Sequence, residues 1–129
     1  MRIGLAVALA LCLAGCESAP SRQPIDLRTV VSNPAEFDGK PIAVHACINV
    51  IVHGVALLPC GERRPNIDIK APSAGPSHYD DLVSYAHRNM GSSPEELPVV
   101  VSGQFQDSAS TGEARHSITI TSFTPEATR

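Results

Sequence analysis

IAVHACINVIVHGVALLPC, residues 42–60, contains two apolar segments with a His-Gly pair between them. From Ile42 to Val52, every second residue is apolar, and this alternation is typical of a β-strand that buries one face. The second apolar segment follows directly after His53-Gly54. A two-residue hairpin loop suits glycine, because glycine tolerates a positive φ. The stretch therefore predicts a β-hairpin that begins an antiparallel sheet.

The loop position also predicts the register of this hairpin. If His53 and Gly54 form the loop, residues whose numbers add up to 107 face each other, and Cys47 lies opposite Cys60. The Cα atoms of such a non-hydrogen-bonded pair are about 4.5 Å apart, and disulfides accept roughly 4.4–6.8 Å. We therefore expect a disulfide between Cys47 and Cys60. Two free, buried thiols are the alternative, and Pro59 argues against a regular ladder because it lacks a donor.

The N-terminus, MRIGLAVALALCLAGC, has the features of an export signal. One cation, Arg2, precedes an apolar run from Ile3 to Ala14, which is shorter than the about 18 residues that span a bilayer. The run ends in Leu13-Ala14-Gly15-Cys16, which resembles the lipobox of bacterial lipoproteins. The resemblance implies cleavage before Cys16, acylation of that cysteine and attachment to a membrane through the lipid. An ordinary secretory signal or an anchor helix is the alternative.

The residue after the lipobox bears on location. In lipoproteins of enteric-type bacteria, aspartate at this position favours retention in the inner membrane. This sequence has Glu17, so the resemblance implies the outer membrane, with the domain facing the periplasm. Of the four cysteines, Cys12 would leave with the signal and Cys16 would be acylated, which leaves Cys47 and Cys60 as a pair in an oxidising compartment. No C-x-x-C motif indicates a metal or redox site.

Composition limits the size and the partners of the domain. Cleavage before Cys16 removes 15 of the 129 residues and leaves 114, enough for one small domain with a modest core. Arg2 is the charged residue that would be lost, so the formal net charge changes from −3 to −4. An acidic chain with three Phe, two Tyr and no Trp lacks the basic, aromatic-rich surface that nucleic acid requires, so we expect no nucleic-acid partner.

The rest of the chain alternates between strand and helix patterns. Asp26 can cap a short helix that Pro34 ends. Beyond the hairpin, we expect a strand at 66–71, a helix at 77–90, a strand at 99–106, a loop at 107–115 and a strand at 116–123. This order predicts a mainly β fold: a five-stranded, OB-fold-like barrel with one helix between strands three and four.

Two motifs in this region also carry a family resemblance. Asp38-Gly39-Lys40 before the first strand and V-V-V-x-G-x-F at Val99–Phe105 resemble the small OB-fold envelope proteins of Gram-negative bacteria. The resemblance covers residues 25–124 and implies the fold rather than an activity. The chain would then comprise a signal peptide (1–15), a lipidated tether (16–24), an OB-fold-like domain (25–124) and a C-terminal tail (125–129).

No catalytic or metal-binding motif stands out. Asp80, Ser84 and His87 share one face of the predicted helix, but a solvated helix face lacks the oriented base and oxyanion hole that a hydrolase needs. They are interpreted as its polar side. The five histidines show no paired ligand spacing, so we expect neither metal nor cofactor; they are His45, His53, His78, His87 and His116.

Two loops are the remaining candidates for ligand binding. Arg63-Arg64, after the second strand, could bind an anion or a phosphate, or could simply be solubilising turn residues. OB-folds bind ligands between the first and the fourth inter-strand loops. Here the first of these loops has only two residues, so only the loop at 107–115 could reach over a ligand.

These patterns favour a non-enzymatic role. We expect an outer-membrane lipoprotein that acts as a periplasmic binding or interaction module, with an unidentified ligand and an envelope protein or glycan as partner. The alternative is a structural accessory subunit of a cell-envelope complex. A small hydrolase is a third and weaker candidate.

Overall fold

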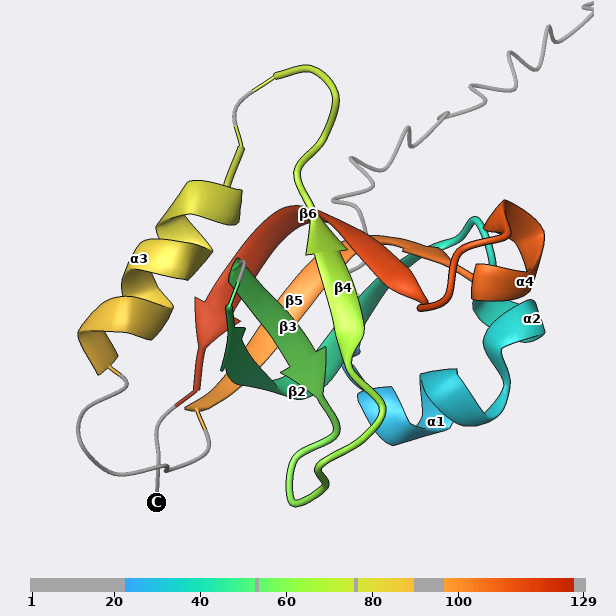
Figure 1. Cartoon of the computed structure of the whole chain (residues 1–129), viewed down its shortest axis with the longest axis horizontal. Helices are drawn as coiled ribbons and strands as arrows, with labels where there is room; N and C mark the ends of the chain where they lie inside the picture. The colour runs from blue at the N-terminus through green and yellow to red at the C-terminus, as the bar shows by residue number, and fades with distance from the viewer. Residues whose placement is uncertain (1–22, 53, 76, 90–96, 127–129) are drawn as a thin grey trace, which may run out of the picture.

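The computed structural model describes residues 23–52, 54–75, 77–89 and 97–126 (Figure 1). The strands are β1 (Ile25–Asp26), β2 (Pro41–Ile51), β3 (Gly54–Leu58), β4 (Ile67–Lys70), β5 (Leu97–Gln106) and β6 (Ser117–Pro125). The helices are α1 (Leu27–Ser32), α2 (Pro34–Phe37), α3 (Tyr79–Asn89) and α4 (Ser108–Thr111). None of the described helices is both long and apolar enough to cross a membrane.

The strands form one sheet that closes on itself. The order is β1-β2-β3-β4-β6-β5, and β5 also pairs with β2, so five strands form a closed barrel while the two-residue β1 extends one edge of β2. Four of the barrel pairings are antiparallel, and β4 with β6 is parallel. Because α3 connects β4 to β5, the predicted mainly β, five-stranded, OB-fold-like barrel is confirmed.

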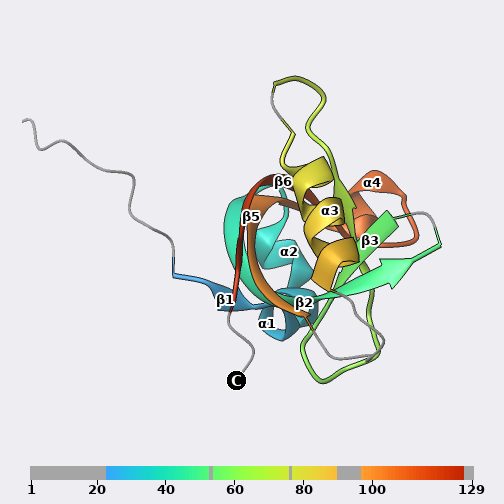
Figure 2. The same cartoon turned by 90° about the vertical axis from the view of Figure 1, so that its left-hand side faces the viewer.

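Apolar side chains from the strands fill the barrel, and helices cover its two ends (Figures 1 and 2). The strand residues of the core cluster that are completely buried are Val44, Leu57, Ile67, Val99, Val101, Phe105, Ile118 and Ile120. Leu27 and Val30 of α1 and Leu82 and Ala86 of α3 join the same cluster. The barrel is therefore a packed core rather than a hollow container.

The two predicted helices form, with small differences at their ends. The Asp26 side chain accepts a hydrogen bond from the Arg28 amide at 2.8 Å, as a helix cap does, and Pro34 both follows α1 and opens α2. The predicted helix at 77–90 is α3. Ser77 Oγ accepts a hydrogen bond from the Tyr79 amide at 3.1 Å, and Met90 lies outside the described residues.

The predicted hairpin forms, but its predicted register is wrong by two residues. Val50 pairs with Val55, Cys47 with Leu58 and Ile51 with Gly54, so the numbers of paired residues add up to 105 and not to 107. Gly54 has the positive φ expected of it, at 144°, but as the first residue of β3. Val52, predicted to face the core, is 92% exposed because it lies beyond the last residue of β2.

The disulfide forms although its register argument fails. Cys47 and Cys60 are bonded, with their Cα atoms 5.0 Å apart. Pro59 has no amide hydrogen to donate, and β3 ends at Leu58. The chain then turns, with the Glu62 amide bonded to the Pro59 carbonyl at 3.1 Å. The bond therefore joins Cys47 of β2 to the turn after β3 and not to a directly opposite residue.

Candidate functional site

A pocket of about 440 Å³ lies between the segment before β4 and the segment before β6. Its lining residues are Arg64, Pro65, Asn66, Ser108, Ala114, Arg115 and His116. Its volume falls within the roughly 300–1,000 Å³ of small-molecule sites. The lining is mostly polar and cationic, which makes this pocket the candidate binding site.

The parallel pairing of β4 with β6 brings these two segments together. Asp68 pairs with Ser117, and the Asp68 amide donates a hydrogen bond to the His116 carbonyl at 3.0 Å. In a parallel pair, both strands begin at the same edge. The residues just before β4 and those just before β6 therefore emerge side by side, although about fifty positions separate them in the sequence.

The loop at 107–116 is held in shape by hydrogen bonds to two aspartates, Asp107 within it and Asp38 outside it. Asp107 caps α4 by accepting a hydrogen bond from the Ala109 amide at 3.0 Å. Asp38 Oδ1 accepts bonds from the Asp107 amide at 2.9 Å and from Ser110 Oγ at 3.1 Å. These bonds fix the loop against the segment before β2 and place Ser108 at the pocket.

His116 is a half-buried member of the pocket. Its ring lies 5.6 Å from the Phe105 ring, between centroids, and its Nδ1 accepts a hydrogen bond from the Ser108 amide at 2.9 Å. Because Nδ1 acts as an acceptor, Nε2 carries the ring hydrogen. The second ring nitrogen, Nε2, is then the donor, and Asp107 Oδ1 lies 3.4 Å from Nδ1.

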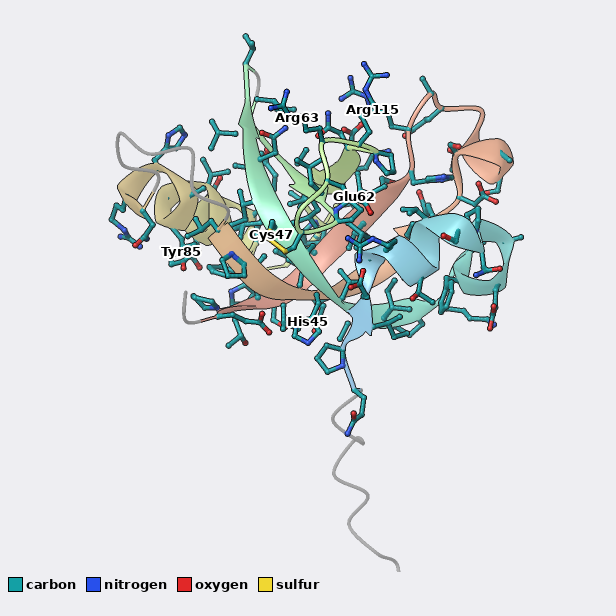
Figure 3. All side chains as sticks on the ribbon, turned by 90° about the horizontal axis from the view of Figure 1, so that it is seen from below. His45, Cys47, Glu62, Arg63, Tyr85 and Arg115 are labelled. Carbon is teal, nitrogen blue, oxygen red and sulfur yellow. A yellow bond between two sulfur atoms is a disulfide. The ribbon has the colours of Figure 1, made fainter. Side chains whose placement is uncertain are left out.

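The two arginines of the pocket differ in their partners. Arg115 Nη1 lies 3.5 Å from Asp68 Oδ1. Arg64 has no ion pair with any described residue, and neither has its neighbour Arg63. Figure 3 shows Arg63 and Arg115 extending from the same end of the molecule. The pocket therefore carries positive charge that the described carboxylates do not fully balance.

Asn66 is a further polar residue of the pocket lining. Its Oδ1 accepts a hydrogen bond from Asn49 Nδ2 at 3.1 Å. This bond uses the acceptor end of the amide and leaves the Asn66 NH2 group without a hydrogen bond to a described residue.

A second polar cluster holds the arginine-bearing turn in place. The Arg28 guanidinium bonds to Glu62, and its Nη2 donates to the Cys60 carbonyl at 2.9 Å. The hydrogen bond that Arg28 donates to Glu62 is the main cause that raises the pKa of Arg28, and the negative charge of Glu62 raises it further. Because Glu62 is thereby paired with α1, it does not neutralise the two arginines that follow it in the chain.

The arrangement can hold an anion, because Arg64, Arg115, Asn66, Ser108 and His116 all carry hydrogen-bond donors. Among the described residues, no group of three or more His, Cys, Asp or Glu could hold a metal ion.

The structure brings together some of the residues that the sequence singled out. Arg64 lines the pocket, and so does the loop that was predicted to reach over a ligand. The sequence patterns did not predict that Arg115 and His116 lie close to the Arg63-Arg64 turn. The strand order of an OB-fold, in which the fifth strand lies beside the third, would have indicated this proximity.

Other candidates do not join this site. Asp80, Ser84 and His87 are exposed on α3, as the polar side of that helix. His45 Nδ1 lies 2.7 Å from Glu126 Oε1, and His78 Nδ1 lies 3.6 Å from Asp81 Oδ2. Two further candidates, His53 and Cys16, lie outside the described residues.

Comparison of the chain with protein-family models, curated proteins and solved structures finds no match. The fold and the site are therefore interpreted from their own geometry.

Proposed function

We propose that the protein is an outer-membrane lipoprotein whose barrel is a non-enzymatic binding module in the periplasm. The lipobox-like Leu13-Ala14-Gly15-Cys16 supports the anchor. The Cys47–Cys60 disulfide supports an oxidising compartment, because structural disulfides persist there and are rare in the cytosol. The closed barrel agrees with the resemblance to small OB-fold envelope proteins, which carries no activity with it.

The position of the pocket relative to the tether is the observation that carries the binding role. Arg63 and Arg115 lie at the end of the molecule opposite β1, where the described chain begins (Figure 3). The proposed tether, residues 16–24, spans at most about 30 Å when extended. A short anchor at one end and an open cationic pocket at the other suit a module that presents its site away from the membrane.

Substitution of the acylated cysteine tests the anchor. Cys16→Ser removes the thiol that would carry the lipid. One acyl chain holds a protein on a membrane only marginally, whereas two chains hold it stably. We expect the variant to leave the membrane fraction or to accumulate unprocessed, as measured by fractionation, immunoblotting and mass spectrometry of the N-terminus. Density-gradient separation of the two membranes tests the outer-membrane assignment for the unaltered protein.

Cys12→Ser is the matched control, because Cys12 lies in the segment that cleavage would remove. It should leave both processing and membrane association unchanged. A Cys16→Ser variant that remains in the membrane at the processed size would contradict the lipoprotein proposal.

A second candidate function is that of a structural subunit in an envelope complex. The β2–β3 hairpin favours it, because the hairpin projects on the side opposite β1 (Figure 2) and ends in the exposed Val52. Ile51, beside it, is only partly buried. A partner cross-linked through this hairpin, with no ligand in the pocket, would favour the structural role over the binding role.

A further inference from the structure

We infer that the pocket between the segments before β4 and β6 binds an acidic sugar by its carboxylate or phosphate group. The inference rests on the proposed binding-module function and names the ligand class of the same site.

The positive charges of the pocket favour the binding of an oxyanion. Arg64 and Arg115 line the pocket from two separate loops, and the Arg64 guanidinium has no ion pair with a described residue. A guanidinium binds carboxylate or phosphate through two parallel hydrogen bonds, and such bonds are stronger than neutral ones. Two arginines on facing loops can therefore hold one oxyanion between them.

The neutral residues of the pocket support the same charge preference. Asn66 has its acceptor oxygen bonded to Asn49, and His116 has its Nδ1 bonded to the Ser108 amide. Both bonds use the acceptor atoms, which leaves the Asn66 NH2 group and the His116 Nε2–H as donors. Of the acids close to the pocket, Asp68 is already paired with Arg115, and Asp107 accepts the Ala109 amide as the cap of α4.

The size of the pocket indicates a ligand larger than the oxyanion itself. Its volume of about 440 Å³ leaves room for a body attached to the charged group. Of the lining residues, only His116 has an aromatic ring, and that ring packs against Phe105. Nucleobase sites rely on aromatic stacking platforms. A hydroxylated body bonded by Asn66 and Ser108 suits this polar lining better, which points to a sugar.

Calorimetric titration of the purified full-length protein in detergent tests the inference with four probes. Glucuronate carries a carboxylate, glucose 6-phosphate carries a phosphate, glucose carries no charge, and inorganic phosphate has no sugar. We expect at least one charged sugar to bind, more tightly than inorganic phosphate, and glucose not to bind. Whichever charged sugar binds identifies the oxyanion.

Two substitutions and one control locate the binding. Arg64→Gln and Arg115→Gln should each weaken the charged sugar about tenfold, since each removes a charge-assisted interaction. Arg88→Gln is the matched control, because Arg88 is an exposed arginine on α3 without an ion pair to a described residue. It should bind as the unaltered protein does. Amide NMR shifts at Asn66, Ser108 and His116 should follow the titration in the unaltered protein.

Four results would overturn the inference. In the first, neither charged sugar binds. In the second and third, glucose or inorganic phosphate binds as tightly as the charged sugar. In the fourth, Arg88→Gln weakens binding of the charged sugar as much as Arg64→Gln and Arg115→Gln do. The Cys16→Ser fractionation is independent of the pocket. A protein that passes that test but binds no acidic sugar would refute the ligand class alone, whereas sugar binding without a membrane anchor would refute the proposed location alone.

Discussion

Of the described glycines, Gly103 has the least room for a side chain. A Cβ built there would lie 2.1 Å from the Thr119 carbonyl oxygen and 2.9 Å from Ile118 Cγ2. The ladder between β5 and β6 shifts register between Ser102 and Gly103. Glycine within a strand often marks a bulge or a close backbone approach, and here both occur together. The absence of a side chain lets the backbone of β6 approach β5 closely at this register shift.

Gly103→Ala should therefore destabilise the protein. The added methyl group must displace the backbone of β6, and overpacking of this kind costs about 1–3 kcal/mol. Chemical unfolding measures the change. Gly112→Ala is the comparison, because a Cβ at Gly112 meets nothing within 4 Å and only its φ of 70° opposes alanine, at about 1–2 kcal/mol. Equal or greater stability of Gly103→Ala than of the unaltered protein would contradict this account.

At the scale of elements, the β2–β3 hairpin and the turn after it form one cross-linked unit. The disulfide joins Cys47 to Cys60, and the carbonyl of Cys60 accepts a bond from Arg28 of α1. β3 pairs with β4 through only two residue pairs, Ala56 with Asp68 and Leu57 with Ile67. The cross-link thus compensates for a short ladder and holds the turn that carries Arg63 and Arg64.

Removal of both cysteines should lower the free energy of unfolding. Closing a loop of about fourteen residues stabilises a protein by about 3 kcal/mol in the chain-entropy model. We expect a loss of this order in a Cys47→Ala, Cys60→Ala double variant. A reducing agent should have a similar effect on the unaltered protein and none on the variant. Two free thiols in the non-reduced protein, detected by mass spectrometry, would show that the bond does not form.

At the scale of the whole molecule, helices at the two ends complete the core that the strands enclose (Figure 1). α3 contributes Leu82 and Ala86, which are completely buried, and its Tyr85 ring lies 5.9 Å from the Phe123 ring of β6, between centroids. The helix between β4 and β5 is therefore part of the core and more than a connection.

Leu82→Ala should open a cavity at this end of the barrel. Truncation of a fully buried leucine costs about 2–5 kcal/mol, depending on how far the site collapses. Thermal and urea unfolding should show the loss. Ser84→Ala, at an exposed position of the same helix, should change stability by less than about 0.5 kcal/mol. If both variants unfold alike, α3 does not contribute to the core as described.

The sequence by itself determined the five barrel strands, α1, α3 and their order, but not the short elements β1, α2 and α4. Apolar residues at every second position predicted β2, the 3.6-residue period predicted α3, and Asp26 predicted the start of α1, because these signals act between neighbouring residues. The strand order then followed from the known OB-fold and not from any single residue. The disulfide partners were also predicted correctly, since the described domain holds only two cysteines.

Only the tertiary structure decided the hairpin register and the pocket. A register in which paired residue numbers add up to 105 keeps the same alternation as one in which they add up to 107, so the apolar pattern cannot distinguish the two registers. The pocket joins Arg64 to Arg115 through the parallel pairing of β4 with β6. No local pattern connects residues that far apart along the chain, because only the closing of the barrel brings the starts of these two strands together.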